Sequence, residues 1–348
     1  MKYSEKLIFS LLLVLIPSMV LVAQNRIPET SGFGGYFLTG PGIFQIKSNL
    51  LVTGPPLTGN VGDPVINSVF EQAESNSSFA WPLAGELNYT FSASKTQIFF
   101  GNGLEDILRL DVPVGIGVRQ QLKDSSMLTF RILTTPLKLK FWEDPYVENE
   151  EREKTKLNFQ GIRFRWAKMF KTGFEFTTTI RKYNFDDERS GDWLISEGRL
   201  DPSEQPLLNR DGFVYRFRLL YQINLDQKHI LRPAISYIND DHKGEAIANQ
   251  GYLLKLNYLR RSQKFLFDAD LRIGQRFASA DHPVYDDRID SFRFGAAVSA
   301  FIPIKFFDSN RWSIWISADY IAEDSQIDFF DSRLLGIMGG LMYRANRK

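Results

Sequence analysis

The chain has 348 residues, of which 43% are hydrophobic, 14% aromatic and 24% charged, with a formal net charge of +1. This neutral balance gives no basis for binding nucleic acid or a strongly charged partner. The chain has no cysteine, which excludes disulfides, thiolate metal sites and a lipidated N-terminal cysteine.

The N-terminus has the parts of a secretory signal peptide. Lys2 and Lys6 precede an apolar run that begins at Leu7 and ends at Ala23, where polar residues follow. This pattern predicts a signal peptide over residues 1–23 and leaves residues 24–348 as one mature domain. The alternative is an uncleaved anchor, for which the run is slightly shorter than the roughly 20 residues that a membrane span needs.

Beyond the signal peptide the apolar residues alternate with polar ones, and no run is long enough for a transmembrane helix. From Phe213 to Leu225 the odd positions are apolar or aromatic, whereas the even positions include Arg216 and Arg218. Successive side chains of a strand point to opposite faces, so one face is apolar and the other polar. Similar stretches recur along the chain and predict a wall between lipid and water. An exported soluble β-protein is the alternative.

The predicted strands are joined alternately by short and long connections, as in an outer-membrane barrel with tight periplasmic turns and long extracellular loops. The short connections are predicted at 92–95, 123–126, 170–173, 226–228, 261–264 and 306–311. The long ones are predicted at 48–81, 103–106, 142–155, 186–210, 239–250, 278–290 and 323–328. We therefore predict an all-β, antiparallel, up-and-down transmembrane barrel of about 14 strands, or about 12 if a weak strand such as Gln97–Gly101 is absent.

Two predicted strands change parity along their length. The apolar residues are even-numbered from Leu128 to Ile132 but odd-numbered from Leu137 to Phe141, and the next strand changes parity around Gly161. One-residue bulges near Thr135 and near Gly161 would restore the register. Alternatively, these strand ends leave the membrane, where parity no longer matters.

The polar faces of the predicted strands carry more bases than acids. The charged residues predicted to face the lumen are Arg109, Asp111, Arg119, Arg131, Arg163, Arg165, Glu175, Arg181, Arg216, Arg218, Arg232, Lys255, Asp268, Asp270, Arg272, Arg293 and Asp319. In a confined lumen an excess of bases attracts anions and repels cations. The alternative is a plugged lumen in which these charges pair across strands into structural ladders.

The connection Ser48–Trp81 is too apolar for a freely solvated loop. Ile66, Val69, Phe70 and Ala73 have helical spacing. We expect this segment to fold over or into the barrel mouth and narrow it, or else to extend a strand above the membrane. The acids of the other long connections, such as Glu143 to Glu151, lack calcium-loop spacing and are predicted to be solvated.

Aromatic residues near the strand ends are predicted to form the two interfacial girdles. They are Trp81, Tyr89, Trp142, Trp166, Tyr183, Tyr221, Tyr237, Trp312 and Tyr343. No catalytic, cofactor-binding or metal-binding motif accompanies the three histidines, His229, His242 and His282, so we expect a protein that is not an enzyme and needs no cofactor.

The segments Gly85–Phe91, Thr96–Asn102, Leu104–Asp106, Gly117–Gln120 and Trp142–Tyr146 resemble a bacterial family of uncharacterised outer-membrane β-barrel proteins, known only as a domain of unknown function. The resemblance covers nearly all of the mature chain. It implies an exported barrel in the outer membrane, and no activity or functional residue. Many barrels end on an aromatic residue that the assembly machinery reads, whereas five residues follow Tyr343 here.

We therefore predict a narrow channel for small, preferentially anionic solutes. A barrel of this size lies between barrels of about eight strands, which side chains fill, and barrels of about 16 to 18 strands, which hold open channels. Its expected partners are outer-membrane lipid and lipopolysaccharide, the barrel-assembly machinery and a small-molecule solute. One alternative is a closed structural or surface-binding barrel without transport. Another is a transporter of lipid or other hydrophobic substrates with a lateral opening, for which Pro113 and Pro136 in neighbouring strands are candidate positions.

Overall fold

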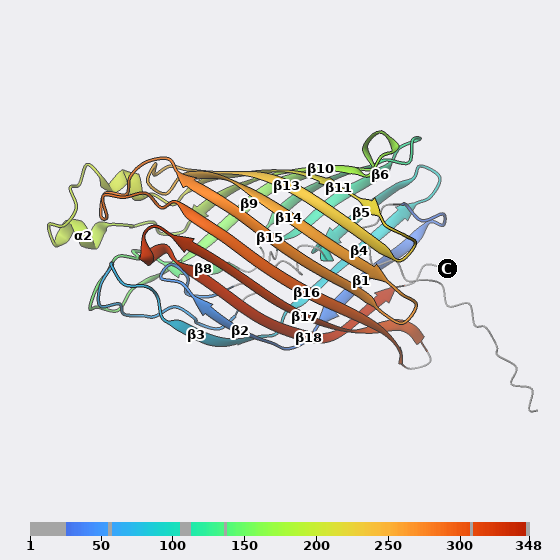
Figure 1. Cartoon of the computed structure of the whole chain (residues 1–348), viewed down its shortest axis with the longest axis horizontal. Coiled ribbons are helices and arrows are strands. Elements are labelled where there is room, and N and C mark those ends of the chain that lie inside the picture. The colour runs from blue at the N-terminus through green and yellow to red at the C-terminus, as the bar shows by residue number, and fades with distance from the viewer. Residues whose placement is uncertain (1–25, 55–57, 105–112, 136–137, 307–308, 346–348) are drawn as a thin grey trace, which may run out of the picture.

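In the computed structural model the chain forms a closed antiparallel β-barrel of 14 strands (Figure 1). The structure describes residues 26–54, 58–104, 113–135, 138–306 and 309–345. The predicted signal peptide, Arg109 and Asp111 lie outside the described residues. The barrel closes because β1 pairs with β18 on one side and with β4 on the other.

Four barrel strands are interrupted, and each is made of two segments. They are β1 (Gly32–Thr39) with β2 (Gly42–Lys47), β3 (Ser75–Ala80) with β4 (Leu83–Phe91), β7 (Met127–Thr134) with β8 (Leu139–Trp142), and β11 (Gly212–Tyr221) with β12 (Ile223–Asn224). The others are β5 (Thr96–Gly101), β6 (Val114–Gln121), β9 (Lys154–Ala167), β10 (Phe174–Phe185), β13 (His229–His242), β14 (Asn249–Arg261), β15 (Leu266–Ala278), β16 (Ser291–Phe306), β17 (Ser309–Ser325) and β18 (Ser332–Ala345). Since β5 pairs with both β4 and β6, the 12-strand alternative is wrong.

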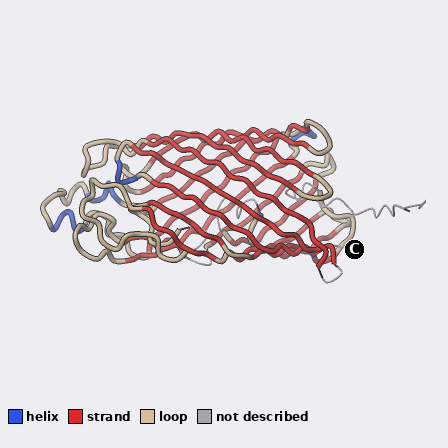
Figure 2. The backbone as a smooth tube through the Cα atoms, turned by 60° about the horizontal axis from the view of Figure 1, so that its bottom comes forward, coloured by secondary structure: helices blue, strands red, loops and turns tan. Residues whose placement is uncertain are grey.

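The two ends of the barrel differ, as the alternation of short and long connections predicted. Short turns lie at the end where β1 begins and β18 ends, and long loops lie at the other end, which carries the short helix α2 (Asp192–Ser196) (Figure 2). In the described part of the chain no helix is both long and apolar enough to span a membrane.

Side chains alternate between a lipid-facing surface and the lumen. On β18, Leu335, Ile337 and Leu341 are exposed on the outside, whereas Met338 and Met342 are buried inside. The same alternation gives most strands an exposed apolar outer row. A closed sheet with such a belt leaves no unpaired edge in the hydrocarbon, so the protein lies in the bacterial outer membrane.

The two predicted bulges are both wrong. β9 pairs with β10 from Leu157 to Ala167 without a shift, so Leu157 and Phe159 face the lumen, where the Arg181 guanidinium lies 4.8 Å from the Phe159 ring centre. Between the pairs Thr134↔Gln160 and Leu139↔Leu157 the chain advances five residues on one side and three on the other. The strand formed by β7 and β8 therefore has two residues more than β9 at this point. An even number of extra residues leaves the alternation between lumen-facing and lipid-facing side chains unchanged.

Candidate functional site

The lumen brings together the charged residues that the sequence analysis selected. The structure places the following on strand positions that alternate with the lipid-facing side chains: Arg119, Arg131, Arg163, Arg165, Glu175, Arg181, Arg216, Arg218, Arg232, Lys255, Asp268, Asp270, Arg272, Arg293 and Asp319. Near the outer end, Asp240, Arg276 and Glu323 also face the lumen and pair with one another. The two acids were not predicted to do so, because β13 and β17 extend further outward than the alternation of their residues indicates.

Many of these charges form ion pairs across neighbouring strands. Glu175 pairs with Arg165 and, at 3.1 Å, with Arg218. Asp270 contacts Lys255 and Arg272, and Asn257 donates hydrogen bonds to both carboxylate oxygens of Asp268.

A second group of ion pairs lies nearer the outer end. Glu323 pairs with Arg293 at 3.0 Å and with Arg276, which also contacts Asp240. On the far side of the barrel Arg119 pairs with Glu86. The lumen therefore contains charge ladders, as the plugged alternative expected, together with a surplus of bases.

The surplus is concentrated on three adjacent strands, β9, β10 and β11, which we call the arginine wall. Their lumen-facing charges are five arginines and one acid: Arg163, Arg165, Arg181, Arg216, Arg218 and Glu175. Arg216 is exposed, so water inside the barrel reaches it. In the closed order of 14 strands, the strand formed by β1 and β2 lies seven strands from β11 and so faces this wall.

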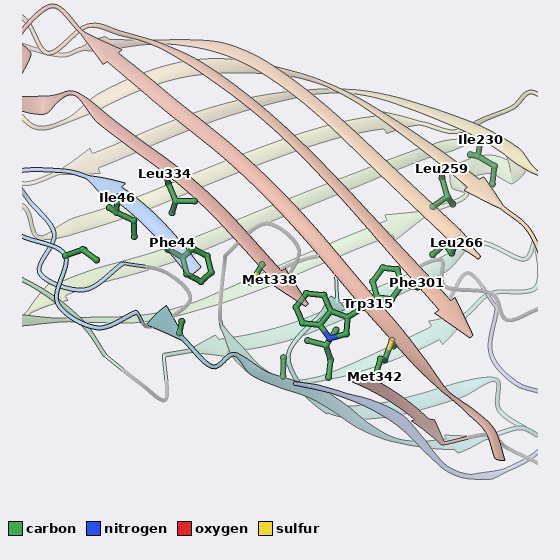
Figure 3. Packing of buried hydrophobic residues seen from close by; sticks show 14 residues of the cluster. Phe44, Ile46, Ile230, Leu259, Leu266, Phe301, Trp315, Leu334, Met338 and Met342 are labelled. Carbon is green, nitrogen blue, oxygen red and sulfur yellow. The ribbon is translucent and has the colours of Figure 1, made fainter. Parts of the chain in front are cut away.

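The side of the lumen opposite the arginine wall, formed by β18, β1 and β2, carries an apolar row. With Val61 of the loop between β2 and β3, buried side chains from β1–β4 and β13–β18 form one cluster, which we call the apolar lane: Leu38, Phe44, Ile46, Val61, Ala80, Ala84, Ile230, Leu259, Leu266, Phe301, Trp315, Leu334, Met338 and Met342. The lane extends from the periplasmic ends of β13–β15 to the outer ends of β2 and β18 (Figure 3). Lumens of outer-membrane barrels are typically polar, so an apolar row along this one is unexpected.

The outer end of the barrel is covered by loops that share a hydrophobic core, which we call the lid. Its buried residues come from five connections and include Val69, Tyr146, Leu194, Leu208 and Phe329, and Tyr285 of a sixth packs against them. The loop between β2 and β3 meets the β17–β18 loop, where Asn49 Nδ2 donates to Phe329 O, and the β15–β16 loop, where Tyr285 Oη donates to Val69 O. The β8–β9 loop meets the β15–β16 loop from the opposite side of the barrel, because Tyr146 Oη lies 2.9 Å from His282 Nε2. The described loops therefore cross the mouth in this state.

Arg152 anchors the lid from within. Its guanidinium lies 4.4 Å from the Trp142 ring centre and donates to the carbonyls of Asn49, Pro145 and Asp63. Burial lowers the pKa of Arg152 to about 10, which leaves it charged at neutral pH. Trp142 is buried here, so its assignment to the aromatic girdle was wrong. Tyr183 was also misassigned, since it contacts Phe159 on the lumen side.

Two acids predicted to be solvated are instead structural parts of the lid. Asp144 accepts hydrogen bonds from the backbone N–H groups of Tyr146, Gly191 and Trp193 and so joins two loops. Burial raises the pKa of Asp144, although these bonds oppose the shift. Glu148 accepts from Val69 N and from Arg199, and these bonds outweigh burial and lower its pKa.

His282 is completely buried among the lid's aromatic rings. Its Nε2 lies 2.9 Å from the Tyr146 hydroxyl, and the Tyr285 and Phe330 rings pack against it. Burial lowers the pKa of His282 to about 3, so the ring is neutral at physiological pH. No group of three or more His, Asp or Glu residues in the described part of the chain is arranged to hold a metal ion.

The connection predicted at 48–81 contributes both to the barrel wall and to the lid. The expectation that it folds over the mouth and the expectation that it extends a strand are therefore each confirmed in part. Residues 75–80 form β3 and extend a strand outward, while Ile66 and Val69 enter the lid core. The helical spacing of Ile66, Val69, Phe70 and Ala73 was misleading, because these residues form turns and extended chain. Leu51 forms an isolated bridge with Phe141 of β8.

Solved structures that resemble this fold are outer-membrane barrels of low sequence identity. The outer membrane channel DcaP of Acinetobacter baumannii matches with a TM-score of 0.38 and 9% identity over 90% of this chain and 97% of its own. The COG4313 outer membrane channel from Pseudomonas putida F1 matches with a TM-score of 0.42 and 10% identity, over 91% and 97%. An anion-selective porin from Comamonas acidovorans matches with a TM-score of 0.39 and 6% identity, over 91% and 100%.

No curated protein matches the sequence. One family model does, over residues 32–344, which is the whole barrel from β1 into the last residues of β18. The chain therefore belongs to this family, which is described as a protein of unknown function (DUF2860).

Proposed function

We propose that this protein is a narrow, gated outer-membrane channel that favours anions. The observation that carries the proposal is the arginine wall, where five arginines face the lumen with one glutamate. Inside a confined, low-dielectric wall such an excess raises the local anion concentration. Ion pairing reduces but does not remove the excess, since Glu175 is shared by two of the five arginines.

The lid makes the channel gated rather than permanently open. Its loops are joined by a hydrophobic core and by buried charged residues such as Arg152 and Asp144. Conduction then requires part of the lid to move. The same lid favours a second candidate, a closed barrel with a structural or surface-binding role, which has no permeable state.

Ion release from proteoliposomes separates the two candidates. Vesicles with the full chain and protein-free vesicles are loaded with potassium chloride and diluted into sodium nitrate of equal osmolarity, so that exchange of chloride for nitrate and of potassium for sodium keeps each vesicle neutral. Ion-selective electrodes follow chloride and potassium release. The channel predicts faster chloride release than from protein-free vesicles, with potassium release lagging. Equal release from the two kinds of vesicle would support the closed barrel, and potassium release faster than chloride release would contradict the anion preference.

A further inference from the structure

Part of the barrel wall is not made by barrel strands. Towards the outside, the pairing of β4 with β5 ends at Glu86↔Gly101 and that of β6 with β7 ends at Val114↔Thr134. β3 and β8 continue beyond this level on either side. In the described part of the chain β5 and β6 do not reach this level, and another described segment lies in the outer wall between β3 and β8.

A two-stranded ribbon from the loop between β2 and β3 occupies this place. We define the ribbon as Leu50–Thr53 and Asn60–Gly62; Val61 N donates to Val52 O at 2.8 Å and so joins its two strands. On one side the N–H groups of Val52 and Thr53 donate to Lys140 O of β8, at 3.0 and 3.2 Å. On the other side, Gly59 N, next to the ribbon, donates to Phe79 O of β3 at 3.3 Å.

The ribbon is attached over fewer residues than a barrel strand. Towards β8, Trp142 N also donates to Leu50 O at 3.4 Å and Lys140 N to Thr53 Oγ1 at 3.0 Å. Towards β3, the described hydrogen bonds are that of Gly59 and those from the Asn76 amide to Val61 O and Asp63. A barrel strand such as β9, in contrast, pairs with β10 at eleven consecutive positions. The ribbon also continues directly into the lid, whose core holds Ile66 and Val69. Movement of the lid would therefore pull on the ribbon.

The inner side chains of the ribbon belong to the apolar lane. Val61 is one of its buried members, and Leu51 packs against it. Gly54, beside the ribbon, lies so close to Ile46 that a Cβ there would come within 2.1 Å of the Ile46 Cδ1 atom. When the ribbon leaves the wall, the outer end of the lane around Ile46 is uncovered.

We propose that the ribbon is a lateral gate and that the lane behind it receives the hydrophobic body of an organic anion. The ligand class is a carboxylate with an alkyl or aryl body. The lane takes the body, since burying a methylene group contributes about 0.8 kcal/mol. The arginine wall across the lumen attracts the carboxylate and orients it away from the lane. This inference rests on the proposed function and names its substrate class.

A disulfide clamp tests the gate, and the cysteine-free chain allows it without other changes. In Leu51→Cys/Phe141→Cys the cysteines replace the bridge partners of ribbon and β8. The matched control, Leu139→Cys/Leu157→Cys, joins β8 to β9 at a paired position of the permanent wall. Binding of octanoate to the full chain in nanodiscs is measured by calorimetry against empty nanodiscs. We expect oxidation of the clamp to slow octanoate binding at least ten-fold, seen as a delayed release of heat, and reduction to restore the rate, with no change in the control.

Three further measurements test the proposal even if the clamp variant does not fold. With the unmodified protein, affinity should rise roughly three- to four-fold per methylene from butanoate to octanoate, as burial of the chain requires. Octyltrimethylammonium, which has the same body and the opposite charge, should bind at least ten-fold more weakly than octanoate. In Gly54→Leu the added side chain holds the ribbon off Ile46, so octanoate should bind faster than to the unmodified protein.

Different experimental results would overturn this inference and the proposed function. Chloride preference in the ion-release assay, with octanoate binding that ignores both the clamp and the chain length, would overturn the gate and the lane alone. Absence of chloride preference in the unmodified protein would overturn the anion channel on which both rest.

Discussion

Glu175 accepts charge-assisted hydrogen bonds from arginines on both neighbouring strands, Arg165 of β9 and Arg218 of β11. It is the one acid on the lumen face of the arginine wall. Its replacement by glutamine keeps the shape and removes the charge. We predict that Glu175→Gln raises the anion-to-cation permeability ratio about seven-fold, because one charge roughly 7 Å from the ion path in water shifts the energies of an anion and a cation by about 0.6 kcal/mol in opposite directions. Reversal potentials check this, and an unchanged or lowered ratio would place Glu175 away from the path.

Arg152 holds three loop carbonyls and should decide the stability of the lid. In Arg152→Ala the buried carbonyls of Asn49, Pro145 and Asp63 lose their donor. We predict a loss of about 3 kcal/mol in the free energy of lid opening, seen as faster hydrogen exchange in residues 143–153. Arg189→Ala, which removes a largely exposed arginine paired with Glu143, is the control and should have little effect. Equal exchange in both variants would refute the anchor.

The lid should loosen in acid because of His282. Its pKa is about 3 in the folded protein, below the ordinary value of 6.5. The unfolded lid therefore binds more protons between these values, and stability present above pH 6.5 is lost as the pH falls towards 3. We predict faster proteolysis of the outer loops at pH 4.5 than at pH 7, and a smaller difference in His282→Phe. A difference of the same size in both proteins would exclude His282 as its source.

Because Ile337 faces lipid, the folding free energy lost by placing a charge there should depend strongly on its depth in the membrane. Ile337 is exposed near the middle of β18, whereas Phe33 is exposed at the beginning of β1, close to the periplasmic rim. Ile337→Arg should cost about 2–4 kcal/mol of folding free energy, and Phe33→Arg about 0–1 kcal/mol. Urea unfolding in lipid vesicles measures both. Equal costs would contradict the orientation of β18 in the membrane.

Alternation predicted the barrel because lipid and water act on every strand in the same way. The strand count, the sidedness of the connections and the lumen parity of residues such as Arg218 all follow from this one pattern. The pattern predicted the wrong orientation where side chains that face the lumen are apolar. Leu157 and Phe159 face the lumen, and the rule that apolar side chains face lipid required a bulge that β9 does not have.

The lid and the ribbon could not be predicted, since both depend on contacts between distant loops. Asp144 gains its partners from Gly191 and Trp193, and Leu51 pairs with Phe141 only after the barrel closes. The apolar character of the first loop was a real signal that it would be buried. Periodicity within that loop misled, because turns and loop–loop packing bury Ile66 and Val69 without forming a helix.

The reversal potential across a planar bilayer with a potassium chloride gradient tests the central claim most directly. The unmodified protein should show a potential of the sign set by chloride. Arg216→Glu/Arg218→Glu, which reverses two charges of the arginine wall, should shift that potential towards the value for potassium. A double substitution of similar size on the outer surface of β11, Phe217→Gln/Leu219→Gln, should leave it unchanged. Absence of conductance, or a potassium preference in the unmodified protein, would contradict the account.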